Sequence, residues 1–132
     1  MGQEYRRTAT TVSLINYHFV FCPRYRRKVL AKQVEARFKE LVQELCLKND
    51  WLIVAMEVMP DHVHLVLNVL PTDSPADIMA KLKGATSRDL RQEFKHLKHL
   101  QSLWTRSYLV STAGNISSET IERYVEEQKT RG

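Results

Sequence analysis

The stretch Met59–Leu67, MPDHVHLVL, places two histidines one residue apart in an otherwise apolar run. Alternate side chains of a β-strand point to opposite faces of the sheet, so this run predicts a strand with one apolar face that packs on helices. That face carries Val63, Leu65, Leu67 and Val69. His62 and His64 then lie side by side on the other face, just after a predicted tight turn at Pro60-Asp61.

Two imidazoles that converge on one sheet face are suited to chelating one divalent ion. The competing interpretation is that His62 and His64 are solvated or hydrogen-bonded on an exposed face, because a short motif of this kind is weak by itself. Two ligands are also incomplete for a metal. A third ligand would have to come from another part of the chain.

The remaining periodicity predicts a chain of alternating strands and helices. Apolar alternation predicts strands over Val12–Cys22, from Trp51 to Val58, over the eight residues from His62, and from Leu103 to Thr112. Apolar residues at three- and four-residue steps predict helices over about Ala31–Lys48, from Ser74-Pro75 to about Phe94, and from a cap at Ser117 or Ser118 through Gln128. Gly114-Asn115 is a turn signal before the last helix.

This order, β-α-β-β-α-β-α, predicts an α+β fold. Two β-α-β units give a ferredoxin-like (RRM-like) split antiparallel sheet with helices on one face, and the additional C-terminal helix carries Tyr124. Because the chain has 132 residues, we expect a single domain over residues 1–132. The face of the sheet that the helices leave free is available to a ligand or a second subunit.

Composition narrows the partners. The net charge of +5, from 20 Lys and Arg against 15 Asp and Glu, favours a polyanionic partner such as nucleic acid. Cys22 and Cys46 are too few for a disulfide framework and lack the paired spacing of a zinc site. A polar start, and the absence of an apolar run of about 18 residues, predict a cytoplasmic protein with no membrane span.

The predicted last helix contains a second candidate site. In the segment ETIERYVEEQ, Tyr124 and Gln128 are four residues apart and share a helical face. The ordinary interpretation is an amphipathic helix with a core tyrosine. A nucleophilic phenol requires a base or a metal, and Gln128 could bring an amide oxygen to such a metal.

Five segments, in this order and spacing, resemble one known family. They are YHFVFCPRYRRKVL, MPDHVHLVL, KLKGATSRDLRQEF, LWTRSYLVSTAG and IERYVEEQ. They are similar to the transposases of the IS200/IS605 insertion sequences, which are single-tyrosine members of the His-hydrophobic-His endonuclease superfamily. The resemblance covers nearly the whole chain, from about Tyr17 to Gln128.

The resemblance implies a DNA transposase. His62, His64 and Gln128 would bind Mg²⁺ or Mn²⁺, and Tyr124 would attack single-stranded DNA to give a 5′-phosphotyrosine and a free 3′-OH. That hydroxyl would later attack another phosphotyrosine, so strands are cut and rejoined. The family also implies a homodimer whose active sites are shared between subunits, and DNA hairpins at the ends of the element as partners.

Basic residues in two of these segments would contact phosphates. They are Arg24, Arg26, Arg27 and Lys28 in the first segment, and Lys83, Ser87 and Arg88 in the third. His18 and Asp61 are the candidates for a general base. The alternative function is a non-catalytic nucleic-acid-binding module on an RRM-like fold, although the strands lack the aromatic motif that such modules use.

Overall fold

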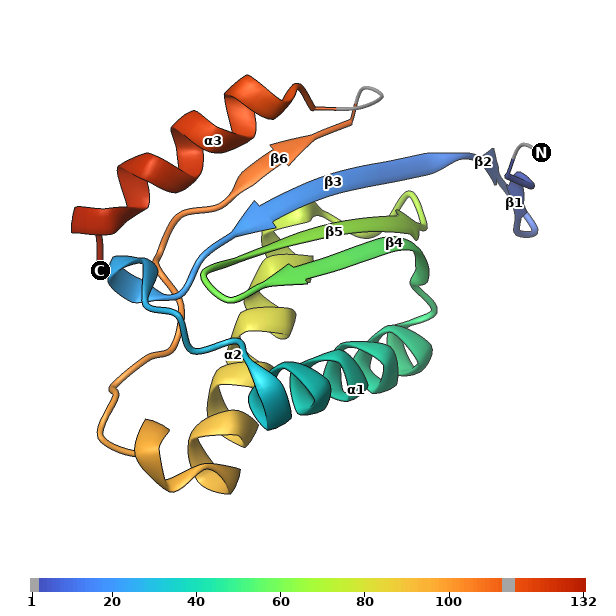
Figure 1. The fold of residues 1–132 in the computed structure, drawn as a ribbon. Coiled ribbons are helices and arrows are strands. Elements are labelled where there is room, and N and C mark those ends of the chain that lie inside the picture. The colour runs from blue at the N-terminus through green and yellow to red at the C-terminus, as the bar shows by residue number, and fades with distance from the viewer. Residues whose placement is uncertain (1–2, 113–115) are drawn as a thin grey trace.

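A four-stranded antiparallel sheet forms the centre of the fold, in the order β4-β5-β3-β6 (Figure 1). The structure is a computed structural model, and the residues that it describes are 3–112 and 116–132. The strands are β3 (Ile15–Phe21), β4 (Leu52–Met59), β5 (His62–Val69) and β6 (Leu109–Ser111). The predicted α+β class with an antiparallel sheet is confirmed.

Strand β5 has the two different faces that its alternating sequence predicts. Its four apolar residues Val63, Leu65, Leu67 and Val69 are each 0% exposed. They belong to a core formed with Phe19, Phe21 and the apolar residues of α1 (Lys32–Asn49) and α2 (Pro75–Glu93). This apolar face fixes the orientation of the strand, so the histidines are held on the opposite face.

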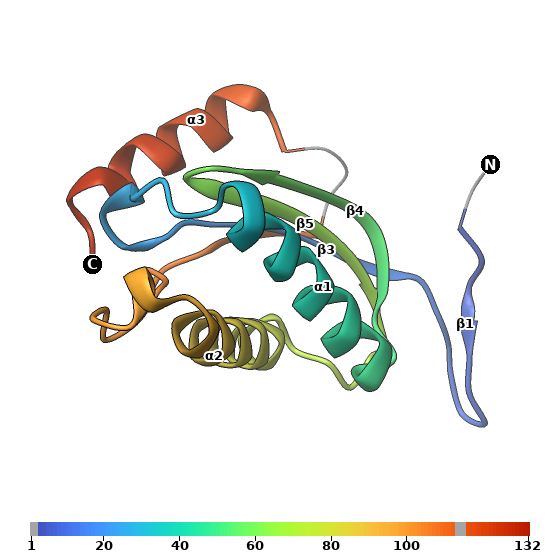
Figure 2. The same cartoon turned by 60° about the horizontal axis from the view of Figure 1, so that its bottom comes forward.

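Helix α3 (Ser118–Glu127) lies on the opposite side of the sheet from α1 and α2 (Figures 1 and 2). Its buried Val125 packs against Val20 and Cys22, which are on the face of β3 that points away from α1 and α2. We predicted that this face is free, and the structure corrects that prediction in part. Both α3 and this part of β3 carry an apolar stripe, and burying one against the other removes both from water.

The helix ends follow the expected capping rules. The hydroxyl of Ser74 accepts a hydrogen bond from the backbone N–H of Asp77 at 3.1 Å, with Pro75 in the first turn. Ser117 caps α3 in the same way, through the N–H of Thr120. Helix α1 ends at Asp50, whose left-handed backbone (φ 59°) lets its N–H bond to the last turn.

Two regions differ from the prediction. The last strand is only Leu109–Ser111, because Leu103, Trp104 and Thr105 are buried in a non-strand segment that is packed against the core. The strand predicted over Val12–Cys22 is divided into β2 (Val12–Ser13) and β3, and β2 forms a small hairpin with β1 (Arg6–Arg7) that was not predicted. The turn expected at Gly114-Asn115 lies outside the described residues.

Short 3₁₀ turns complete the chain: η1 (Arg24–Arg26), η2 (Lys95–Leu97) and η3 (Gln128–Thr130). Turn η1 follows β3 and η3 follows α3, and the two turns contact each other near the start of β5 (Figure 1). Within residues 3–112 and 116–132, none of the helices is both long and apolar enough to cross a bilayer.

Candidate active site

His62 and His64 lie next to each other on the face of the sheet that also carries α3. Their ring centroids are 5.2 Å apart and the rings are inclined by 49°. Both side chains are half-buried. Since an imidazole nitrogen binds a metal at about 2.0–2.1 Å, two rings at this separation can reach one ion. We call Asp61, His62 and His64 the histidine site.

Asp61 orients the first of these imidazoles. Its Oδ1 accepts a hydrogen bond from Nδ1 of His62 at 2.8 Å, and its Oδ2 accepts one from Nε of Arg26 at 2.7 Å. Burial alone would raise the pKa of Asp61, but the hydrogen bonds from His62 and Arg26 lower it below its ordinary value. In the neutral imidazole of His62, an ionised Asp61 therefore holds the proton on Nδ1, and the lone pair is on Nε2.

The electrostatics of His64 favour a neutral ring. Burial lowers the pKa of His64, and the nearby His62 and His18 lower it further, while Glu57 acts in the opposite direction. A metal binds the neutral form of imidazole, so desolvation keeps His64 in the form that can act as a ligand. The contacts described for His18 do not indicate a role as the general base, so that role stays a prediction.

A cavity of about 270 Å³ adjoins the histidine site. His18, Glu57 and His64 line it from the sheet, and Ile116 and Ile121 line it from the side of α3. Glu57 was not singled out from the sequence, although it could have been, because the turn at Pro60-Asp61 pairs it directly with His64. The cavity thus brings titratable groups from three strands together beneath α3.

Tyr124 and Gln128 form a second, separate cluster with Ser107. The Ser107 hydroxyl donates to Oε1 of Gln128 at 2.9 Å and lies 2.9 Å from the Tyr124 hydroxyl. A serine has one hydroxyl proton, so in this arrangement the phenol of Tyr124 is the donor to Ser107. Nε2 of Gln128 donates to the backbone carbonyl of Tyr124 at 3.1 Å. We call Ser107, Tyr124 and Gln128 the tyrosine site.

The tyrosine site is uncharged, and Ser107 and Tyr124 in it are half-buried. Gln128 is 0% exposed although it follows the last residue of α3. Burial raises the pKa of Tyr124, and the hydrogen bond with Ser107 only partly opposes this effect. In this position Tyr124 is therefore a protonated phenol. Neither Ser107 nor the half-buried position of Tyr124 was predicted from the sequence, because only the folded chain brings these segments together.

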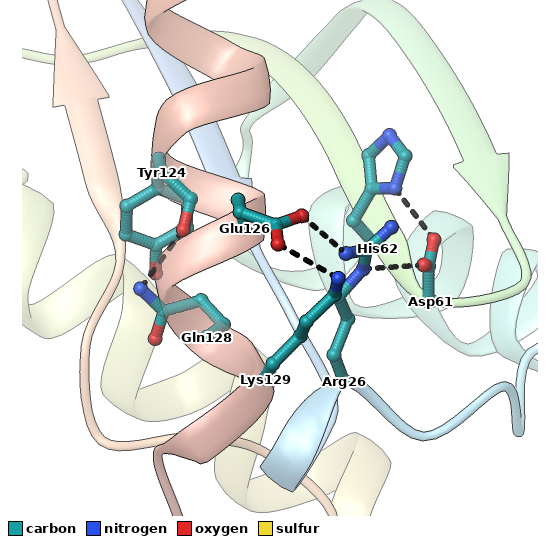
Figure 3. Close-up of polar contacts among 7 residues, drawn as sticks. All are labelled: Arg26, Asp61, His62, Tyr124, Glu126, Gln128 and Lys129. Carbon is teal, nitrogen blue, oxygen red and sulfur yellow. Dashed lines mark hydrogen bonds and ion pairs between the residues drawn. The ribbon is translucent and has the colours of Figure 1, made fainter.

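The two sites do not meet within the described residues. Figure 3 shows Tyr124 and Gln128 on one side of α3, and Glu126 on the other side, toward Arg26, Asp61 and His62. No described hydrogen bond joins Tyr124 or Gln128 to His62 or His64. The described residues also contain no cluster of three or more His, Cys, Asp or Glu that could hold a metal. His62 and His64 thus fit a metal as a pair of imidazole ligands. Within one chain, Gln128 does not join them as a third ligand.

Lys83 connects α2 to the tyrosine site. Its Nζ donates to the backbone carbonyls of Thr105 and Ser107 at 2.9 and 2.8 Å, and it lies 5.3 Å from the ring centre of Tyr108. Burial lowers the pKa of Lys83 to about 8. The structure therefore gives Lys83 a role in holding the segment that carries Ser107, and its predicted phosphate contact stays a prediction.

The other residues predicted on α2 lie at a basic hollow. Ser87 is buried and its hydroxyl accepts from the N–H of Leu103 at 3.1 Å, whereas Arg88 is exposed. A cavity of about 300 Å³ is lined by Lys83, Ser87, Arg88, Arg91 and Arg106, among others. Arg91 and Arg106 were not predicted from the sequence. Arg91 was detectable as the residue three positions after Arg88 on the same helix, but Arg106 arrives through the fold.

The basic residues that follow β3 have different environments. Arg26 makes ion pairs with Asp61 and with Glu126. Arg27 is exposed and its guanidinium lies 5.4 Å from the ring centre of Tyr25. Lys28 is also exposed, and Arg24 is half-buried. Of this group, Arg27 and Lys28 remain most open to a polyanion.

Solved structures share this architecture. A crystal structure of a protein from Deinococcus radiodurans R1, described as a transposase, aligns with a TM-score of 0.86 and 34% identity, over 93% of this chain and 97% of that one. A REP-associated tyrosine transposase bound to a REP hairpin aligns with a TM-score of 0.53 and 18% identity, over 96% and 70%. At that identity the second match shows the shared fold.

Sequence comparisons with curated proteins give the same assignment. The ISDra2 transposase TnpA of Deinococcus radiodurans is 32% identical over 128 residues, which cover 95% of this chain and 91% of that protein. The transposase for insertion sequence element IS200 of Salmonella typhimurium is 31% identical over 131 residues, covering 97% and 85%. The model of the family described as "Transposase IS200 like" matches residues 11–128. The chain belongs to the IS200-like transposase family.

Proposed function

We propose that this chain cleaves and rejoins single-stranded DNA at the ends of an insertion sequence, with Tyr124 as the nucleophile and His62 and His64 as ligands of Mg²⁺ or Mn²⁺. One observation carries the proposal. The pair of imidazoles, with Nε2 of His62 left free by Asp61, faces the same side of the sheet as the helix that bears Tyr124 and Gln128. The strand order β4-β5-β3-β6 supports a ferredoxin-like, RRM-like description of the sheet.

The proposed reaction is a transesterification. The Tyr124 oxygen attacks the scissile phosphorus, the bond from phosphorus to O3′ breaks, and the 3′-hydroxyl leaves with a proton, so that a 5′-phosphotyrosine is formed. A divalent ion at the histidine site supplies Lewis acid assistance to the phosphate. Rejoining is the reverse attack by a 3′-hydroxyl, and it needs no ATP because the phosphotyrosine keeps the energy of the phosphodiester.

We propose further that the working site is shared by two subunits. Within one chain Tyr124 is hydrogen-bonded to Ser107, and Arg26 and Glu126 lie between Tyr124 and His62 (Figure 3). If α3 of one subunit serves the histidines of its partner, Tyr124 and Gln128 leave Ser107, Gln128 completes the ligand set of His62 and His64, and Tyr124 reaches the scissile phosphate. This arrangement agrees with the isologous pairing expected of a homodimer.

The proposed partner is a DNA hairpin next to the cleaved strand, because one solved relative is bound to a REP hairpin. The basic hollow at Arg88, Arg91 and Arg106 and the exposed Arg27 and Lys28 provide the positive charge that phosphates require. A cytoplasmic location stays a prediction.

The test is a covalent adduct. The protein is incubated with labelled single-stranded DNA that carries the end of the element, in Mn²⁺ or Mg²⁺, and analysed on a denaturing gel. We expect an adduct that EDTA and Tyr124→Phe both abolish. An adduct that survives Tyr124→Phe contradicts the assignment of the nucleophile, and no adduct under any condition favours the alternative, a non-catalytic nucleic-acid-binding module.

Mixing two inactive variants tests the sharing of the site. A Tyr124→Phe subunit has intact histidines, and a His64→Ala subunit has an intact tyrosine. If the site is shared, mixed dimers have one complete site, and about a quarter of the wild-type sites return after random exchange of subunits. If the mixture forms no adduct, Tyr124 works with the histidines of its own chain.

A further inference from the structure

Arg26 joins three separate segments of the chain. Its Nε donates to Oδ2 of Asp61 at 2.7 Å, and its Nη1 donates to Oε2 of Glu126 at 3.1 Å (Figure 3). Asp61 lies in the turn between β4 and β5, and Glu126 lies on α3. One guanidinium on η1 therefore connects the histidine site to the helix of Tyr124.

The backbone that presents Arg26 is unusual. Tyr25 and Arg26 have φ values of 56° and 54°, in the left-handed region that residues other than glycine rarely adopt. Such a conformation persists where the surroundings determine it. Here the N–H of Tyr25 donates to the carbonyl of Arg131 at 2.7 Å, and the N–H of Arg26 donates to the carbonyl of Pro23 at 2.9 Å. Turn η1 is thus held against the end of α3 and η3.

The carboxylate that Arg26 contacts has both of its oxygens in use. Asp61 is only 7% exposed, and its two oxygens accept from His62 and from Arg26 respectively. A guanidinium fixed on Oδ2 restricts rotation of the carboxylate, so Oδ1 stays in line with Nδ1 of His62. The orientation and the tautomer of His62 then depend indirectly on Arg26, through Asp61.

We infer that Arg26 is a positioning residue: through Asp61 it holds His62 with Nε2 free for a metal, and through Glu126 it ties the histidine site to α3. This inference rests on the proposed function. It gives Arg26 a role other than the phosphate contact predicted from the sequence, in keeping with a side chain that is only 25% exposed and already paired with two carboxylates.

Arg27 is the matched control. It is the neighbouring arginine and is exposed, and its described contact is with the ring of Tyr25 rather than with Asp61 or Glu126. Arg26→Gln and Arg27→Gln remove the same charge from adjacent positions. They differ in whether they disconnect Asp61.

The experiment is a long-range ¹H–¹⁵N spectrum of the histidine rings in the metal-free, ¹⁵N-labelled protein. In the wild type and in Arg27→Gln we expect neutral His62 to carry its proton on Nδ1. In Arg26→Gln we expect a mixture of tautomers, together with an affinity for Mn²⁺ that is about 10- to 100-fold lower by calorimetry. An unchanged tautomer and an unchanged Mn²⁺ affinity in Arg26→Gln overturn the inference.

The link to α3 is tested separately. Glu126→Gln should leave the tautomer of His62 as in the wild type and increase amide hydrogen exchange in α3 several-fold. The control is Glu119→Gln, which removes an exposed carboxylate whose partner Arg123 lies on the same helix. Equal exchange in Glu126→Gln and the wild type would refute the link.

Two further measurements keep the outcomes apart. If Arg26→Gln is unfolded by circular dichroism, Arg26→Lys replaces it, because an ammonium keeps the charge and cannot bridge both carboxylates in the same way. The inference is overturned if Arg26→Lys changes neither the tautomer of His62 nor the affinity for Mn²⁺. A wild-type protein that forms no DNA adduct contradicts the proposed function, whereas the tautomer of His62 is measured without DNA or metal.

Discussion

The histidine site and the tyrosine site lie over the same face of the sheet, yet they are built in opposite ways. Charged groups organise the histidine site, since Asp61 is fixed by Arg26 and in turn fixes His62. Neutral hydrogen bonds organise the tyrosine site, where Gln128 is fully buried and Tyr124 is a phenol with a raised pKa. In the single chain the proposed ligand His62 is thus already oriented, whereas the proposed nucleophile Tyr124 contacts no charged group among its described hydrogen bonds.

The largest expected effect comes from breaking the histidine site. His64→Ala removes one of the two adjacent imidazoles, and we expect the rate of adduct formation to fall about 10³-fold, because the Lewis acid contribution is several kcal/mol. Hairpin binding should change less than about twofold, since the basic hollow is unaltered. The control is His99→Ala, at an exposed position after η2. A parallel loss of hairpin binding and cleavage would mean that His64 contacts DNA directly.

The next largest effect is on the stability of the protein, and it tests the neutral hydrogen bonds of the tyrosine site. Ser107→Ala removes the hydroxyl that joins Tyr124 to Gln128 and leaves the backbone carbonyl that Lys83 contacts. The buried amide of Gln128 then loses a partner, so we expect the free energy of unfolding to fall by about 1–3 kcal/mol in urea titrations.

The control for Ser107→Ala is Ser102→Ala, whose hydroxyl makes a single longer contact, 3.4 Å, with the carbonyl of Trp104. A loss of less than about 0.5 kcal/mol is expected there. Equal losses at the two positions would show that the hydroxyl of Ser107 does not stabilise the tyrosine site.

The sequence was sufficient where local periodicity decides the outcome. Alternation along β5 predicted which side chains enter the core, and the four residues of that face are fully buried. Ser74 predicted the start of α2, and the alternatives Ser117 and Ser118 predicted the start of α3, because a capping hydroxyl acts within three residues; the structure has Ser117 as the cap. The side-by-side arrangement of His62 and His64 followed from the same two-residue period.

The sequence was insufficient where contacts join distant segments. The pairing of Arg26 with Glu126 spans 100 residues and depends on a left-handed turn that no residue type in RYR predicts. Ser107 reaches Tyr124 because Leu103 to Thr105 are buried in a loop, where the pattern predicted a strand. The position of α3 also depends on Val20 and Cys22, whose outward face looked free in the linear pattern.

A smaller effect concerns Lys83, which holds the segment of the tyrosine site that carries Ser107, and the pH dependence of the free energy of unfolding. Burial lowers the pKa of Lys83 from 10.5 to about 8. Between those values an unfolded chain binds this proton and the folded chain does not, so the free energy of unfolding rises with pH in that window. Lys83→Met should remove this rise, on the order of 1 kcal/mol once screening by solvent is allowed for.

The measurement is a series of urea titrations of the wild type and Lys83→Met at pH values from about 7 to about 10. The slope against pH is compared rather than the absolute stability, because the carbonyls of Thr105 and Ser107 also lose their donor in the variant. Parallel slopes for the two proteins would show that Lys83 is not desolvated in the folded chain.

The smallest effect concerns the basic hollow, where Arg88 and Arg106 are exposed, in contrast to the buried and half-buried groups of the two sites. Arg88→Ala removes one cation from this hollow, while Lys48→Ala removes one from the exposed end of α1. If Arg88 contacts a phosphate, hairpin affinity falls several-fold and the slope of log affinity against log salt decreases by about 1. Lys48→Ala should leave that slope unchanged.

Because Arg88 touches neither Asp61 nor Ser107 in the described structure, the tautomer of His62 and the stability at the tyrosine site should be those of the wild type. A change in either one would mean that the hollow is coupled to the active site and does more than bind DNA.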